Sequence, residues 1–307
     1  MKIRVIVNPR AGSGKASAVA GAVAAELTQR GADFDLRETR GPGDAGTQVA
    51  SAYKDGKTLA LLVGGDGTVN EAVQAFVDES GQPVAGPELG LISAGTGGDF
   101  PRTFGRSDLE TAIERILHRP ARRIDHGVLR CRSFDGTERI HAFANIASFG
   151  ITGLVDRTVN RSPKWIGGRA AFLGGTLVAA AKYRCAPLRV FVDDELWLTG
   201  PCYTVAAANG QYFGAGMRIA PDADPSDGLL DFIALTDPRA RRMLELLPKV
   251  FSGAHIDQPG VQVKRGTQLR AELLRDDDPV YVDSDGENPG TLPFEAWIAP
   301  GGIMLRI

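Results

Sequence analysis

Three short stretches combine glycines with residues that could bind phosphate: "NPRAGSGK" (8–15), "GGDGTVN" (64–70) and "SAGTGGDF" (93–100). Glycine lets backbone N–H groups come close to a ligand, and a helix that follows such a loop adds its positive N-terminal end. Two of the stretches carry a carboxylate, Asp66 and Asp99, which suits a Mg²⁺ ion bridging to phosphate or a bound hydroxyl. One such stretch alone is more often a turn, but three together predict a nucleotide site.

The elements around these stretches alternate between strand and helix. Strands are expected at "KIRVIVN", "DFDLRET", "TLALLVGG" and "ELGLISAG", and helices at "ASAVAGAVAAELTQRG", "DAGTQVASAYKDG", "TVNEAVQAFVDE" and 108–118. This alternation predicts an open parallel sheet with helices on both faces. Such sheets bind ligands at the carboxyl ends of their strands, where all three stretches would lie.

After about residue 122 the pattern changes to strands with few helices. Strand-like runs occur at "RIDHGVLRC", "HAFANIASFG", "LRVFVD", "CYTVAAANG", "LLDFIALT", "LRAELL" and "FEAWIA", and helical patterns at 167–184 and 238–251. We therefore predict a nucleotide-binding α/β domain at 1–122 and a β-rich domain built on antiparallel sheets at 123–307.

Composition excludes several classes of protein. A net charge of −2 argues against nucleic acid as a partner. Cys131, Cys185 and Cys202 form no C-x-x-C pair, which is typical of reduced thiols in a cytoplasmic protein. The N-terminus reads as a first strand rather than a signal peptide, and no apolar run reaches the ~18 residues of a membrane span. We expect a cytoplasmic protein that meets a membrane, if at all, on its inner face.

Two standard phosphate-binding motifs fit poorly. A Walker A loop would need glycine and Ser/Thr where Pro9 and Ala16 stand. The pattern G-x-G-x-x-G fails at Ser17, although Asp35 lies at a suitable distance for a ribose contact. Neither a P-loop NTPase nor an ordinary dinucleotide site is well supported.

The three stretches together resemble the nucleotide loops of the diacylglycerol kinase catalytic domain, which soluble bacterial lipid kinases share with sphingosine and ceramide kinases. "NGQYFGAGMRIAPDADPSDGLLDF" (209–232) and "DGENPG" (285–290) resemble further motifs of that family, so the likeness runs from about residue 3 to the end. It implies an N-terminal open parallel α/β (Rossmann-like) domain, then an antiparallel β-sandwich-like domain with a few helices, and an active site in the cleft between them.

The resemblance also implies site residues. Glu287 matches the family's general base, with Asp285 as its close partner, and Asp66 is the third residue assigned to catalysis. A structural Mg²⁺ is expected on Asp227 and the backbone carbonyls of Asp224 and Leu229. The residues assigned to ATP are Asn8, Pro9, Arg10, Ala11, Gly12, Thr39, Gly64, Gly65, Asp66, Gly67, Thr68, Val69, Asn70, Thr96 and Asp99.

The third loop departs from the family pattern G-T-G-N-D-F-A. Gly98 replaces the asparagine and Pro101 the alanine. The lost amide removes one polar contact, so a catalytically dead lipid-binding member stays an alternative.

The resemblance implies an ATP- and Mg²⁺-dependent kinase, with diacylglycerol as the first acceptor to expect and phosphatidic acid as product. Another lipid alcohol, such as a sphingoid base or monoacylglycerol, is an alternative within the class. Two alternatives lie outside the lipid kinases. One is NAD kinase, which carries a relative of G-G-D-G-T, and the other is a Rossmann-type NAD(P)-binding protein without kinase activity.

The expected partner is a lipid at a membrane surface, and a homodimer is allowed for. "DRTVNRSPKWIGGR" (156–169) mixes Arg157, Arg161, Lys164 and Arg169 with Trp165, a composition that suits anionic headgroups and equally a solvated loop. "PRARRMLELLPK" (238–249) is expected to form an ordinary amphipathic helix. The four histidines (118, 126, 141 and 255) show no triad or ligand spacing and receive no role.

Overall fold

A computed structural model describes residues 1–307 except 95–97, 106, 161–182, 215, 238 and 276–278. Its helical segments are η1 Ala11–Gly14, α1 Ala16–Gln29, α2 Asp44–Lys54, α3 Asp66–Val73, η2 Gln74–Phe76, α4 Asp99–Phe104, α5 Leu109–His118, α6 Ile151–Asn160 and α8 Ala240–Ser252. Its strands are β1 Lys2–Val7, β2 Asp33–Glu38, β3 Leu59–Gly64, β4 Glu88–Ser93, β5 Arg122–Arg132, β6 Glu138–Phe143, β7 Ile146–Gly150, β8 Pro187–Val192, β9 Glu195–Pro201, β10 Thr204–Ala208, β11 Leu230–Leu235, β12 Val261–Gly266, β13 Gln268–Leu273, β14 Tyr281–Ser284 and β15 Glu287–Arg306.

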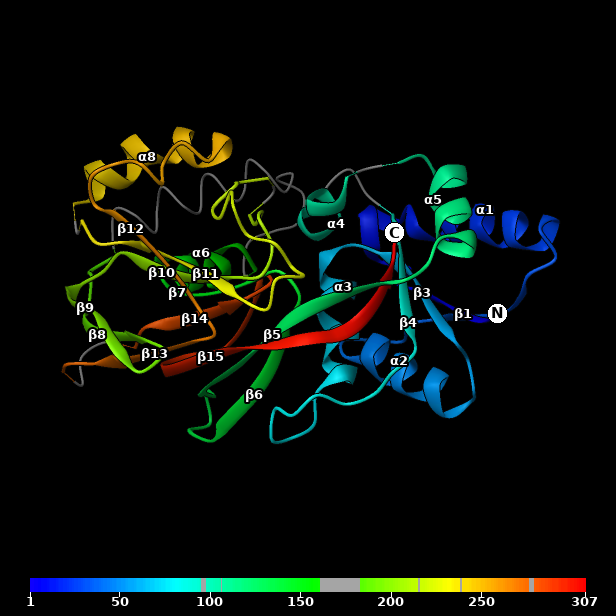
Figure 1. Cartoon of the computed structure of the whole chain (residues 1–307), viewed down its shortest axis with the longest axis horizontal. Helices are drawn as coiled ribbons and strands as arrows, with labels where there is room; N and C mark the ends of the chain where they lie inside the picture. Colours follow the sequence, from blue (N-terminus) through cyan, green and yellow to red (C-terminus); the bar gives the residue numbers. More distant parts are fainter. Residues whose placement is uncertain (95–97, 106, 161–182, 215, 238, 276–278) are drawn as a thin grey trace.

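The first four strands form a parallel sheet in the order β4–β3–β1–β2, shown on the right of Figure 1. β3 is apolar along nearly its whole length because both faces of the sheet are covered. Helices α1 and α5 share one core with the sheet, and α2 and α3 share another. The expected N-terminal parallel α/β fold is confirmed.

The glycine-rich loops lie side by side, because β1, β3 and β4 are neighbours and run parallel. Backbone hydrogen bonds continue past the strand ends, from Asn8 N to Val63 O at 3.0 Å and from Ala94 N to Gly64 O at 2.9 Å. The carboxyl edge of the sheet therefore carries all three loops.

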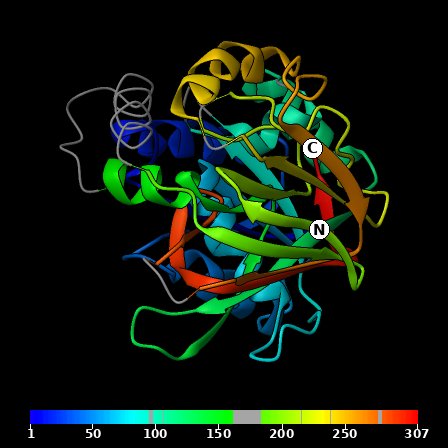
Figure 2. The ribbon, with the colours of Figure 1, turned by 90° about the vertical axis from the view of Figure 1, so that its left-hand side faces the viewer.

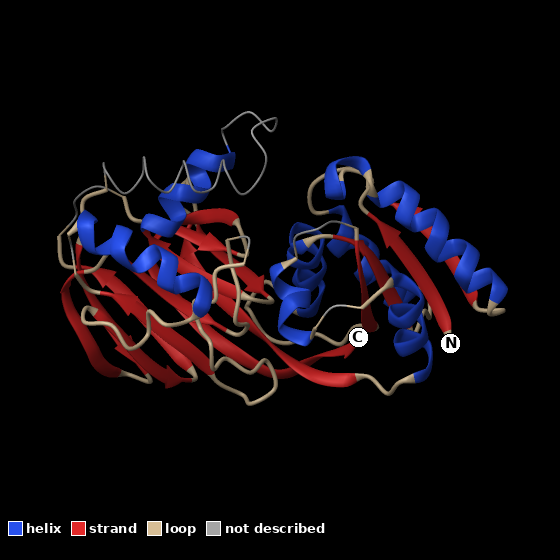
Figure 3. Ribbon diagram, turned by 90° about the horizontal axis from the view of Figure 1, so that it is seen from above, coloured by secondary structure: helices blue, strands red, loops and turns tan. Residues whose placement is uncertain are grey.

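The second domain is built mainly from antiparallel strand pairs, and its strands lie in layers on the left of Figure 3. Phe149 of β7 and Phe294 of β15 meet in its apolar core, with ring centroids 5.1 Å apart. Helix α8 lies across one side of the strands in Figure 2, where Leu246 and Val250 are buried. This arrangement confirms the expected β-sandwich-like domain.

β15 joins the two domains, as the long red strand of Figure 1 shows. Its first residue, Glu287, pairs with Ser284 of β14, and its middle pairs with β13 and β5. Near its end Leu305 pairs in parallel with Leu89 of β4. β15 therefore pairs with strands of both domains. The domain boundary near residue 122 stays a prediction.

Several elements differ from the sequence expectations. α4, α6, β9, β12 and β14 were not expected, and "HAFANIASFG" forms two strands, β6 and β7, rather than one. The run breaks at Ala144 and Asn145 because their N–H groups turn to the carboxylate of Asp285. Most of the helix expected at 167–184 lies outside the described residues, and the one expected at 238–251 is α8.

Within the part of the chain that the structure describes, no helix is both long and apolar enough to cross a membrane.

Candidate active site

The loops after β1 and β3 are locked together by Asn8 and Thr68. Asn8 Nδ2 donates to Thr68 Oγ1 over 3.1 Å, and Arg10 N donates to Asn8 Oδ1 over the same distance. Gly64 allows this contact, because a Cβ there would lie 2.3 Å from Thr68 Oγ1. The first two glycine-rich loops are therefore joined by a direct side-chain hydrogen bond.

The loop after β1 contains three successive left-handed residues, Gly12, Ser13 and Gly14, with φ of 59°, 58° and 88°. Glycine takes this conformation without steric cost, whereas serine seldom does. Backbone strain of this kind often accompanies a functional site. The strained stretch begins at the last of the five consecutive residues, 8–12, that the resemblance assigns to ATP.

Asp66 links the second loop to the third. One carboxylate oxygen accepts from Asp99 N at 2.8 Å, and the other accepts from Phe100 N at 3.2 Å. These N–H groups belong to the first turn of α4, where no carbonyl of the helix can accept from them. The Asp66 carboxylate, on another loop, is their acceptor. Its assignment to catalysis stays a prediction, and the structure gives it a second task of fixing the third loop.

The third loop departs from the family pattern at Gly98 and Pro101, which lie on either side of the buried Asp99 in the sequence and close to each other in space. Asp99 is 7% exposed, with Arg102 Nε 3.8 Å from its carboxylate. A Cβ at Gly98 would lie only 3.2 Å from Cγ and 3.3 Å from Cδ of Pro101. The two departures are therefore coupled, since proline at 101 leaves little room for a side chain at 98.

The remaining residues assigned to ATP differ in what they can offer. Thr39 follows β2, where its N–H donates to Val7 O at 2.8 Å, beside the loop after β1. The Val69 side chain belongs to the apolar core, so a contact with nucleotide would come from its backbone. Gly65 and Gly67 face open space. Thr96 lies outside the described residues.

The motif "DGE" is a two-residue hairpin between β14 and β15. Asp285 and Gly286 have φ of 50° and 87°, the left-handed pair that tight hairpins need. The Asp285 carboxylate accepts from the N–H groups of Ala144, Asn145 and Ile146 at 2.7, 3.1 and 2.8 Å. Burial raises the pKa of Asp285 to about 6, although the three hydrogen bonds by themselves would lower it. Asp285 thus anchors the hairpin to the β6–β7 link.

A pocket of about 590 Å³ lies between the two domains. Residues of α2 and α3, including Asn70 and Glu71, line one side, and His141 and Glu287 line the other. The exposed Glu287 side chain therefore borders the same space as the end of the second glycine-rich loop. That is the arrangement expected if Glu287 takes a proton from an acceptor, and its role and its partnership with Asp285 stay predictions.

Sequence reasoning named only Asn70 and Glu287 among the residues that line this pocket, and it missed the polar side chains of Gln74, Arg139 and His141 among others. Burial lowers the pKa of His141 to about 4, and the charge of Arg139 acts in the same direction, so the imidazole is neutral near pH 7. Its Nε2 lies 3.4 Å from the side-chain amide nitrogens of Asn70 and Gln74. No local spacing signals these contacts, which cross about 70 residues of sequence.

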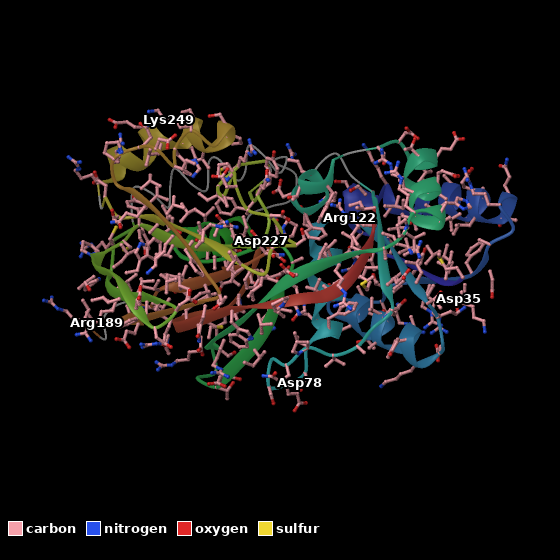
Figure 4. All side chains as sticks on the ribbon, in the orientation of Figure 1. Asp35, Asp78, Arg122, Arg189, Asp227 and Lys249 are labelled. Atoms are coloured by element: carbon pink, nitrogen blue, oxygen red, sulfur yellow. The ribbon has the colours of Figure 1, made fainter. Side chains whose placement is uncertain are left out.

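The expected Mg²⁺ ligands lie on the loop before β11. Asp227 sits near the middle of the molecule in Figure 4, whereas Arg189 of β8 lies at its far end. The Asp227 carboxylate accepts from Leu229 N at 3.0 Å and forms an ion pair with Arg265. Asp224 O lies 3.4 Å from Asp227 N. A carboxylate and nearby carbonyl oxygens suit Mg²⁺, although the ion would share Asp227 with a guanidinium.

The described residues contain no cluster of three or more His, Cys, Asp or Glu side chains that could hold a metal. The expected ligand set has a single carboxylate, so this observation does not bear on it. In the basic segment 156–169, Arg161, Lys164, Trp165 and Arg169 lie outside the described residues.

Two family models match the chain. Residues 2–129 match the diacylglycerol kinase catalytic domain, and residues 145–307 match the YegS C-terminal NAD kinase beta sandwich-like domain. A diacylglycerol kinase of Mycobacterium tuberculosis (strain H37Rv) is 29% identical, over 99% of this chain and 94% of its own length. A probable lipid kinase YegS-like of Xanthomonas axonopodis pv. citri (strain 306) is 33% identical, over 92% and 89%.

Solved structures share the fold. A putative diacylglycerol kinase from Bacillus anthracis str. Sterne superposes with a TM-score of 0.75 at 20% identity, covering 99% of this chain and 97% of its own. A yeast NADH kinase complexed with NADH gives a TM-score of 0.56 at 11% identity, covering 99% and 82%. At these identities the likeness concerns the fold alone.

The fold and the matched models together define a two-domain lipid kinase. The chain belongs to the diacylglycerol kinase catalytic-domain family, whose loop motifs and second-domain motifs it carries in order.

Proposed function

We propose that the protein transfers the γ-phosphate of ATP to a lipid hydroxyl, with diacylglycerol as acceptor and phosphatidic acid as product. The names of several relatives support this acceptor. The observation that carries the proposal is the pocket in which Glu287 faces Asn70, the last residue of the second glycine-rich loop, and Glu71 of α3. A phosphate donor on the loops and an acceptor beside Glu287 would meet there.

In the proposed reaction the glycine-rich loops hold the ATP phosphates through backbone N–H groups, with the positive end of α3 directed at them. The lipid oxygen attacks the γ-phosphorus, the bond to the β-phosphate oxygen breaks, and ADP leaves. Glu287 accepts the hydroxyl proton, a contribution of about 10²–10⁴-fold in general acid–base catalysis. Asp285 acts through the hairpin by keeping Glu287 at the pocket.

Mg²⁺ enters this proposal in two places. With ATP, it would neutralise phosphate charge, and we assign Asp66 and Asp99 as the carboxylates that would hold it. On the second domain, Asp227 with the carbonyls of Asp224 and Leu229 would bind an ion that supports the loop.

A panel of acceptors tests the proposal. The purified protein is incubated with γ-labelled ATP, Mg²⁺ and dispersed diacylglycerol, monoacylglycerol, sphingosine or ceramide, with NAD as a non-lipid acceptor. Diacylglycerol should give the highest kcat/KM, measured as labelled phosphatidic acid. Preferential labelling of another lipid alcohol would replace the acceptor, and labelling of NAD alone would overturn the lipid assignment.

Removing the Asp227 carboxylate should abolish stabilisation by free Mg²⁺. An ion bound to the fold stabilises by mass action without ATP, so excess Mg²⁺ should raise the melting temperature of the wild type but not of Asp227→Ala. Differential scanning fluorimetry with and without Mg²⁺ measures this.

The Arg265 variant separates the metal from the ion pair. Arg265→Gln removes the cation that pairs with Asp227, so its response to Mg²⁺ should equal or exceed that of the wild type. Equal responses in the wild type and Asp227→Ala would remove Asp227 from the metal site.

A further inference from the structure

Gln74, directly after α3, bridges the two domains with its side-chain amide. Ala142 N donates to Gln74 Oε1 at 2.9 Å, and Gln74 Nε2 donates to Ala142 O at 2.8 Å. β6 pairs with β5 alone among the described strands, so its other edge is open. One side chain thus satisfies both main-chain groups of Ala142, as a neighbouring strand would.

The amide can take only one orientation. Its second N–H donates to Asn70 O at 2.8 Å. A flipped amide would set oxygen against the carbonyls of Ala142 and Asn70, and NH₂ against the N–H of Ala142. The three bonds therefore need both the NH₂ group and the oxygen of one amide: the NH₂ group donates to Ala142 O and Asn70 O, and the oxygen accepts from Ala142 N.

The bridge lies between the two halves of the active site. On one side, α3 runs from Asp66 to Val73 and leads directly to Gln74. On the other, the chain continues from Ala142 to the N–H groups of residues 144–146 that hold Asp285, and the hairpin leads on to Glu287. Only a few residues separate the bridge from the proposed phosphate site and from the proposed base.

We propose that Gln74 is a positioning residue, whose bond pair with Ala142 sets the distance between the glycine-rich loops and Glu287. This inference rests on the proposed function, since it assumes that phosphate is bound on one side and deprotonation occurs on the other. A displacement of about 1 Å between reacting groups can reduce a rate about a hundredfold.

Gln74→Leu removes the three bonds with little change in size. We expect kcat to fall at least about tenfold, while the KM for ATP stays within about twofold because the residues assigned to ATP all lie in the first domain. Gln29→Leu is the matched control, since Gln29 is exposed at the end of α1. Unchanged kcat in Gln74→Leu would overturn the proposal.

Gln74→Glu adds a test that loss of packing would not mimic. The carboxylate can accept from Ala142 N but faces two carbonyl oxygens, whereas the protonated acid can donate to one of them. These carbonyls and partial burial favour the neutral acid, so its pKa should exceed the usual ~4.3. The titratable group that faces this position is His141, whose Nε2 lies 3.4 Å from the Gln74 amide nitrogen and whose pKa burial lowers to about 4. The kcat of Gln74→Glu relative to wild type should therefore rise between pH 8 and pH 5.5. A flat ratio would contradict the hydrogen-bonding role.

Hydrogen exchange tests the bridge without any substrate. The peptide covering residues 138–150 should exchange faster in Gln74→Leu than in the wild type or Gln29→Leu, because the Ala142 N–H loses its acceptor and the link to Asp285 loosens. Unchanged exchange would overturn the inference even in an active enzyme. If the lipid assays fail but exchange accelerates, the bridge stands and the proposed function falls.

Discussion

Replacing Glu287 with glutamine is expected to lower kcat by at least about a hundredfold while ATP affinity is retained. Glutamine keeps the shape and reach of glutamate but cannot accept a proton at neutral pH. The fold should persist, because the hairpin is held by Asp285 on three backbone N–H groups and by Asp283, whose carboxylate accepts from Gly286 N at 3.0 Å.

Steady-state kinetics with ATP, Mg²⁺ and lipid varied separately measure this. Glu295→Gln is the control, since it makes the same chemical change on the same strand, where Glu295 pairs with Arg130 at 2.9 Å. A change confined to the affinity for Mg²⁺ or lipid would give Glu287 a binding role instead. A near-normal kcat would exclude it as the base.

The second large effect is expected from Asp66→Ala, which should abolish measurable turnover in a folded protein. The change removes the acceptor of two N–H groups at the start of α4, and with it the side-chain bonds that join Asp66 of the second loop to the end of the third. It also removes a carboxylate assigned to Mg²⁺·ATP. Loss of a capping side chain costs about 0.5–2 kcal/mol of stability, too little to unfold most domains.

Asp108→Ala separates loop geometry from simple loss of a cap. Asp108 accepts from Thr111 N at 2.9 Å at the start of α5, away from the pocket. Its loss should lower the melting temperature by a similar amount and leave kcat unchanged. Labelled-ATP turnover and thermal melting of both variants make the comparison, and full activity in Asp66→Ala would refute the assignment.

The first domain could be predicted well because its signals are local. The apolar run of β3 indicates a strand covered on both faces, and the glycines after it mark where the strand must turn. Parallel strands bring their carboxyl ends to one edge, so the neighbourhood of the three loops follows from the alternation alone.

The contacts that organise the site could not be predicted, because they join residues far apart in sequence. Asp66 reads as a metal or hydroxyl ligand, yet its carboxylate accepts hydrogen bonds from the N–H groups of residues 99 and 100. Gln74 has the appearance of an ordinary residue within an expected helix, whereas α3 ends at Val73 and the bonds of Gln74 to Ala142 span 68 positions. α4 is short and contains Pro101, so its sequence gives little helical signal.

The return of β15 to the first sheet affects how this protein folds as it is synthesised. β4 obtains its outer neighbour only when Leu305 and Arg306 pair with Leu89 and Gly90. Arg306 also pairs with Glu88 and donates to the carbonyls of Ile116 and Arg119, at 3.1 and 2.6 Å, where α5 ends.

Domains commonly fold in order as they leave the ribosome, the N-terminal one first. Here the edge of β4 in a nascent first domain would stay open until Leu305 and Arg306 had been translated. An open strand edge is a template for pairing with other chains. The growing chain would therefore depend on fast completion or on chaperones, and the two domains should unfold together rather than in turn.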